Sequence, residues 1–205
     1  MKVGKKMSLV TVVLEDKCIS MCSDGQITGE TGEVIDHNFK KIKKVNARLL
    51  IGCTGSAEVT KILFSQLDGL LNKDVITFED LNSQIGSFSR DIKGGNFSNG
   101  TIFEVAFFVC GFDRQKKAKC VVYQRKGLNV THESYVINRN DEILFIANDP
   151  IDVKTKSFSR FNRMMKFTNP NNIKDVANIQ KKLNEIVSKE SSSVNNNVFT
   201  EIIYK

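Results

Sequence analysis

The sequence lacks tryptophan and holds only two prolines and two histidines among its 205 residues. Two prolines and 13 glycines exclude collagen-like chains and proline-rich disorder. No run approaches the roughly 18 uncharged apolar residues of a membrane-spanning helix. The apolar run from Met7 to Leu14 ends in two acidic residues and no small-residue cleavage site follows it. We therefore expect no signal peptide, no membrane partner and a cytoplasmic protein.

The five cysteines form no pattern typical of a disulfide framework or a metal site. Their number is odd and they are scattered through apolar runs, which favours reduced thiols in a core. Cys18 and Cys22 would share a strand face about 13 Å apart, at ~3.3 Å per residue, which is too far for one ion. The two histidines, His37 and His132, lie near no cysteine pair. The sequence predicts neither a metal nor a cofactor.

Positive charge is in excess, with a formal net charge of +7 and a pI near 9.1. The basic residues are dispersed, with local clusters around residues 40–44 and 116–119. Nucleic-acid binding would call for interleaved aromatic residues or a recognisable module, and neither is evident. A solvated basic surface is the favoured interpretation, with no nucleic-acid partner.

The apolar pattern changes period along the chain and predicts an α+β protein. Short β-branched or apolar segments predict strands over Ser8–Leu14, Cys18–Cys22, Asn38–Val45, Arg48–Cys53, Thr101–Cys110, Ala118–Gln124, Ile143–Ala147 and Phe199–Tyr204. Helical spacing predicts helices over Ala57–Leu71, from the N-cap Thr77 to about Ile92, over Asp149–Lys166 and over Ile173–Ser188. Runs of each type favour helices packed on antiparallel sheets. With no repeat or linker, we expect a single domain over residues 1–205.

Chemistry-bearing residues gather at the ends of the first predicted strands. Ser8 opens the first strand, and Asp24-Gly25-Gln26 follows the second. Lys41 lies in the third strand, and Gly52-Cys53-Thr54-Gly55 joins the fourth strand to a helix. There is no G-x-S-x-G motif, and the few histidines argue against a histidine-based catalytic triad.

This set resembles the proteasome β-subunit family of N-terminal-nucleophile (Ntn) hydrolases, most closely its bacterial ATP-dependent ring-protease (HslV-type) branch. In that branch the chain starts at a catalytic threonine, and Asp-Gly-Gln follows sixteen positions later, the separation of Ser8 from Asp24. The family's Asn-Val-Lys-Lys-Val is similar to Asn38-Phe39-Lys40-Lys41-Ile42, with one inserted residue. Its Gly-x-x-Gly turn matches residues 52–55.

The second half of the chain is similar over shorter stretches. Residues 109–113 resemble the family's strand-ending Gly-Tyr-Asp, and Glu190 and Ser193 fall where the family has an Asp and a Ser three apart. The two glycines that follow this serine in the family are Val194 and Asn195 here. The family's Gly-Ser-Gly turn before the third helix is replaced by residues 147–150.

The resemblance implies a four-layer αββα sandwich and a catalytic role for Ser8, Asp24, Lys41, Gly55, Glu190 and Ser193. In this hypothesis Ser8 attacks an amide bond and its own α-amine, with a pKa near ~7.7–8.0, accepts the proton. Lys41 lowers the pKa values of the amine and the hydroxyl, Asp24 orients Lys41, and the Gly55 N–H stabilises an oxyanion. The family also implies a peptide or protein substrate, a homo-oligomeric ring and an ATPase partner of unknown identity.

Each of these residues also has an ordinary structural interpretation. Ser8 can simply begin a strand, Asp24 can cap a turn, Lys41 can lie on a solvated strand and Gly55 can supply a turn conformation. The seven residues before Ser8 make its nitrogen an amide, so catalysis requires removal of residues 1–7 as a leader, or translation from Met7 followed by loss of that methionine. The alternative is a non-catalytic homologue that acts as an assembly or binding subunit.

Overall fold

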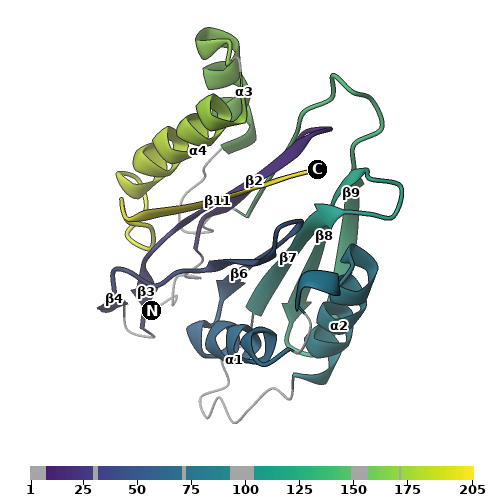
Figure 1. Cartoon of the computed structure of the whole chain (residues 1–205). Helices are drawn as coiled ribbons and strands as arrows, with labels where there is room; N and C mark the ends of the chain where they lie inside the picture. Colours follow the sequence, from purple (N-terminus) through teal and green to yellow (C-terminus); the bar gives the residue numbers. More distant parts are fainter. Residues whose placement is uncertain (1–7, 30–31, 71–72, 93–103, 149–156, 171) are drawn as a thin grey trace.

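The computed structural model describes residues 8–29, 32–70, 73–92, 104–148, 157–170 and 172–205 (Figure 1). Its strands are β1 (Val10–Leu14), β2 (Cys18–Asp24), β3 (Ile27–Thr28), β4 (Val34–Asp36), β5 (Ile42–Asn46), β6 (Leu49–Gly55), β7 (Glu104–Phe112), β8 (Ala118–Lys126), β9 (Asn129–Val136), β10 (Leu144–Asn148) and β11 (Val198–Tyr204). They form a four-stranded sheet in the order β10-β1-β2-β11, a five-stranded sheet in the order β5-β6-β7-β8-β9, and the small β3-β4 hairpin. All the pairings in these sheets are antiparallel.

The two larger sheets share a buried apolar cluster. Side chains alternate between the two faces of a strand, so Val10, Val12 and Leu14 of β1 join Met21 of β2 in a cluster with Phe108 and other residues of the five-stranded sheet. The intervening positions of β1 and β2 are buried as well. These central strands are therefore covered on both faces, which explains why their sequences are mostly apolar and do not alternate between apolar and charged residues.

Helices cover the outer face of each larger sheet (Figure 1). Helices α1 (Ala57–Asp68) and α2 (Phe78–Asp91), with the short 3-10 helix η1 (Lys73–Val75) between them, pack against the five-stranded sheet. Helices α3 (Ser157–Thr168) and α4 (Ile173–Ser188) pack against the four-stranded sheet. None of the helices in the described part of the chain is long and apolar enough to cross a membrane.

Most of the predicted elements are present, and the α+β class is confirmed. Helix α4 has the predicted bounds, and Thr77 caps α2 through a capping box with Asp80. Helix α1 ends at Asp68, with Gly69 as its C-cap, rather than at residue 71. Part of the predicted helix 149–166 and the first residues of the predicted strand 101–110 lie outside the described residues.

Three strands were missing from the prediction. Strand β9 lies at the edge of the five-stranded sheet, and its residues are mostly exposed and polar, so no alternating pattern marks it. Strands β3 and β4 have only two and three residues and their register shifts at Ile27. Such short pairings are held by neighbouring structure, and local strand propensity carries little signal for them.

Candidate active site

The carboxylate of Asp24 is fully buried and accepts three hydrogen bonds at the end of β2. Its Oδ1 accepts the backbone N–H of Leu9 at 3.0 Å, and its Oδ2 accepts the backbone N–H of Gln26 at 2.9 Å. The same Oδ2 lies 2.7 Å from Nζ of Lys41. The backbone N–H of Asp24 also donates to the carbonyl of Leu9 at 3.2 Å. Asp24 is therefore hydrogen-bonded to both the backbone N–H and the backbone C=O of Leu9.

Lys41 precedes β5, and its side chain is only 4% exposed. Its carbonyl accepts the N–H of Cys53 in β6 at 2.8 Å, which fixes the lysine backbone against the five-stranded sheet. The ion pair with Asp24 thus bridges the two larger sheets at one end. Strand β2 supplies the carboxylate, and the residue before β5 supplies the ammonium.

Burial is the largest influence on the titration of this pair. Desolvation raises the pKa of Asp24 and lowers the pKa of Lys41, and the contact between the two groups opposes both shifts. A lysine whose pKa is lowered gives up its proton more readily than a surface lysine. Buried groups perturbed in this way are typical of catalytic sites, although structural ion pairs show such shifts too.

Ser8 lies directly before the residue that Asp24 holds. It is 9% exposed and is joined to Leu9, whose backbone makes both bonds to Asp24. The structure thus brings three of the predicted residues together: Ser8, Asp24 and Lys41. The connection between Ser8 and the ion pair passes through one peptide unit.

Gly55 ends β6 in a conformation with φ +95°, which side chains rarely adopt. A Cβ there would lie 2.2 Å from the carbonyl oxygen of Glu104, so glycine is required. The preceding residue, Thr54, accepts a hydrogen bond from Asn148 at 2.6 Å, and Asn148 pairs with Val10 across β10 and β1. This places the end of β6 at the end of β1 where Ser8 lies.

The last two predicted residues, Glu190 and Ser193, both lie in the loop between α4 and β11, but their side chains make different contacts. Ser193 is buried, and its Oγ lies 2.9 Å from Oγ of Ser191. The carbonyl of Ser192 accepts the side-chain amide of Gln26 at 2.6 Å, so this loop contacts the turn after Asp24. Glu190 is 37% exposed and forms a two-bond ion pair with Arg160 of α3, at 2.7 and 2.8 Å. The structure therefore places the loop that carries Ser193 against the turn after Asp24 and directs the Glu190 carboxylate to α3.

Sequence reasoning missed the amide side chains around the turn after Asp24. Asn195 joins this turn to the segment before β5 through the backbone of Gly25 and His37, and Asn197 donates to the same His37 carbonyl. The stretch of three asparagines at 195–197 is typical of a loop, and nothing in its composition indicates which backbone groups it contacts.

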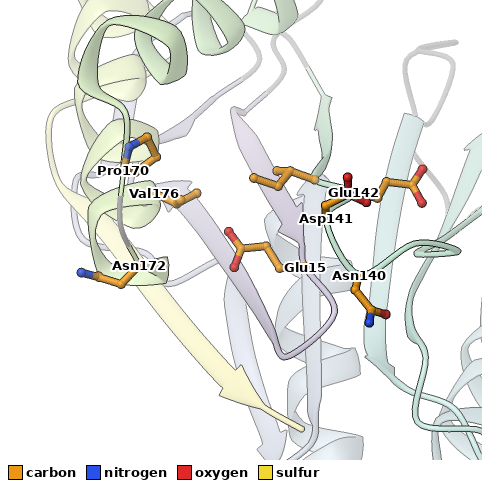
Figure 2. Close-up of a pocket in the computed structure, with 8 residues that line it drawn as sticks. Glu15, Asn140, Asp141, Glu142, Pro170, Asn172 and Val176 are labelled. Atoms are coloured by element: carbon orange, nitrogen blue, oxygen red, sulfur yellow. The ribbon is translucent and has the colours of Figure 1, made fainter.

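A pocket of about 230 Å³ lies at the other end of β1 (Figure 2). Figure 2 shows the carboxylate of Glu15 between the loop that carries Asn140, Asp141 and Glu142 and the segment of Pro170 to Val176. Glu15 directly follows β1, whereas Ser8 precedes this strand, so the pocket is remote from the Asp24–Lys41 pair. Among the residues that the structure describes, no group of three or more His, Cys, Asp or Glu could hold a metal ion.

Two antiparallel sheets with a shared core and an outer pair of helices on each define the class of fold. A eukaryotic HslV from Trypanosoma brucei, solved by crystallography, has a similar structure, with a TM-score of 0.55 and 14% sequence identity. The match covers 96% of this chain and 99% of the HslV chain. No protein-family model and no curated protein matches the sequence. The likeness shows that this chain shares the fold of that HslV, and at this identity it bears on the fold alone.

Proposed function

We propose that this chain is a proteasome-like Ntn hydrolase with a four-layer αββα architecture, which cleaves amide bonds in peptides or proteins once Ser8 is the first residue. The observation that carries the proposal is the buried ion pair of Asp24 and Lys41, hydrogen-bonded to Leu9 beside Ser8. A buried ion pair contributes little net stability compared with apolar packing, so its presence favours a chemical role.

In the proposed reaction the Ser8 Oγ attacks the carbonyl carbon of the substrate amide, and the free α-amine of Ser8 takes the hydroxyl proton. The positive charge of Lys41 lowers the pKa values of both groups, and the N–H of Gly55 stabilises the oxyanion. The C–N bond then breaks as the protonated α-amine returns the proton to the leaving nitrogen. Water attacks the resulting ester, which releases the acid and restores the Ser8 hydroxyl. No metal or cofactor takes part.

Seven residues precede Ser8 in the sequence, so its nitrogen is an amide until they are absent. The proposal therefore includes removal of residues 1–7, or translation from Met7 followed by loss of that methionine. By similarity to the fold family we also propose a cytoplasmic homo-oligomeric ring that works with an ATPase partner.

The test compares two chains of verified mass, one that begins at Ser8 and one that begins at Met1. We expect a peptide boronate to form a 1:1 adduct with the first chain only, as measured by native mass spectrometry. Ser8→Ala and Lys41→Ala should abolish the adduct, and the matched control Ser192→Ala, at an exposed serine, should retain it. Absence of an adduct on a folded chain shown to begin at Ser8 contradicts the proposal.

A second candidate is a non-catalytic subunit used for assembly or binding. It is favoured by the position of Glu190, whose carboxylate forms an ion pair with Arg160 at the surface. This candidate predicts no boronate adduct on either chain and an oligomer in sedimentation experiments. A monomer that forms the adduct would exclude it.

A further inference from the structure

The side chain of Asn195 connects the two chain segments that carry the ion pair. Its Oδ1 accepts the N–H of Gly25 at 3.1 Å, and its Nδ2 donates to the carbonyl of His37 at 2.8 Å. Gly25 is the residue after Asp24, and His37 lies four residues before Lys41. One amide group therefore spans the segments that hold the carboxylate and the ammonium.

Asn195 is itself held by two further hydrogen bonds, one to its backbone and one to its side chain. Its backbone carbonyl accepts Nδ2 of Asn184, a buried residue of α4, at 2.7 Å. Its Oδ1 also accepts the N–H of Asn197 at 3.2 Å. Because its own backbone and its acceptor are held in this way, the side chain loses little further rotamer freedom when it binds Gly25 and His37.

The Gly25 turn has little room to move within this contact. A Cβ on Gly25 would lie 2.8 Å from the His37 carbonyl and 2.9 Å from the ring of Phe199. The Gly25 carbonyl accepts the N–H of Phe39 at 2.9 Å, so the two segments are already in direct backbone contact. Asn195 completes a second bridge between the same two segments.

We propose that Asn195 is a positioning residue that sets the approach of the Asp24 carboxylate to the Lys41 ammonium by clamping the Gly25 turn to the segment before Lys41. The geometry of the Gly25 peptide determines where the Gln26 N–H lies, and this N–H is one of the three donors to Asp24. Loss of the clamp lets the turn move away and admits water to the pair. The catalytic consequence of this clamp rests on the proposed function, whereas its effect on the ion pair does not.

Asn197 provides a matched comparison. Its Nδ2 donates to the same His37 carbonyl at 2.9 Å and to Oδ1 of Asn38 at 3.0 Å, and this side chain is exposed. Asn197→Ala removes a contact to the segment before Lys41 and leaves the contact to Gly25 intact. Asn196→Ala, at the exposed neighbouring position, serves as the surface control.

The first measurement follows the ammonium of Lys41 by carbon-detected NMR of labelled lysine, with Lys41→Met to assign the signal. We expect Asn195→Ala to move the titration midpoint of Lys41 toward that of an ordinary lysine, while Asn196→Ala leaves it unchanged and Asn197→Ala gives a smaller shift. Asn195→Ser, which keeps a shorter polar group, repeats the measurement if the alanine variant fails to fold. An unchanged Lys41 titration in a folded Asn195 variant overturns the proposal.

The second measurement is the rate of boronate adduct formation on the chain that begins at Ser8. We expect Asn195→Ala to slow it by between about 10-fold and 100-fold, because small misplacement of reacting groups carries losses of this size. Asn196→Ala should match the parent chain. If the parent chain forms no adduct but its Lys41 titration still responds to Asn195→Ala, the proposed function fails and the positioning role stands.

Discussion

Two carboxylate–cation pairs of equal length lie in very different surroundings. The Asp24–Lys41 pair and the Glu190–Arg160 pair each have an N···O distance of 2.7 Å. The first pair is 0% and 4% exposed and joins β2 to the segment before β5, whereas the second is 37% and 26% exposed and joins the loop after α4 to α3. Family resemblance assigns Asp24 and Glu190 to one site, but the surroundings of the two carboxylates differ.

The contrast extends to the direction of the pKa shifts. Burial raises the pKa of Asp24, and contact with Lys41 only partly offsets this effect. The hydrogen bonds from Arg160 lower the pKa of Glu190, which water still reaches. An exposed carboxylate is charged with or without a partner, and a neighbouring cation adds only a small stabilisation. A buried carboxylate stays ionised only if a cation lies beside it. The predictions below test this difference.

Lys41→Met should have the largest effect on stability. It leaves the Asp24 carboxylate buried without its cation, and breaking such a pair costs about 3–5 kcal/mol of unfolding free energy. Urea denaturation of the parent chain and of Lys41→Met measures the difference in unfolding free energy. The double variant Asp24→Asn with Lys41→Met should recover part of the loss. A loss no larger than that of Arg160→Met would contradict the difference between the two regions.

Gly55→Ala should cause the next largest loss of stability. It tests whether the end of β6 is packed as tightly as the buried ion pair. The new Cβ would meet the Glu104 carbonyl at 2.2 Å, and φ is +95°. We expect a loss of about 1–3 kcal/mol, in the range for strained backbone conformations. Gly69→Ala is the control, because Gly69 has φ −76° and its nearest neighbour lies at 3.5 Å. Equal losses for the two variants would contradict the prediction.

The sequence could predict those site residues whose positions follow from strand ends. Asp24 and Gly55 end β2 and β6, so the apolar runs already bring these two residues to strand termini. Lys41 fell inside the predicted strand 38–45, whereas β5 begins only after it, at Ile42. The sequence could not predict the partner of Glu190, because Arg160 lies thirty residues away and their contact depends on how α3 packs on α4. The role of Asn195 depends likewise on the path of a loop.

Thiol reactivity tests burial along β2, the strand that carries Asp24, without changing any residue. Burial raises the pKa values of Cys22, in β2, and of Cys18, at the start of this strand, to about 12. At pH 8 about one in 10,000 such thiols is ionised. We therefore expect the native protein to react very slowly with Ellman's reagent, and Cys18, at 6% exposed, to react before Cys22, at 2%. In urea all five thiols should react. Rapid reaction of Cys22 in the native protein would contradict the burial of this region.

Glu190→Gln should have the smallest effect, and the size of this effect depends on pH. The hydrogen bonds from Arg160 lower the pKa of Glu190 in the folded chain, so the folded state holds this proton less tightly than the unfolded state. The pair therefore contributes stability above the unfolded pKa of about 4.3 and loses that contribution as the pH falls through the lower folded value. The melting temperature of the parent chain should exceed that of Glu190→Gln slightly at pH 7, and the two should converge near pH 3. High salt at pH 7 should also narrow the gap, because water and ions screen an exposed pair. A gap that persists at pH 3 or in high salt would mean that this pair is as sheltered as the pair of Asp24 and Lys41.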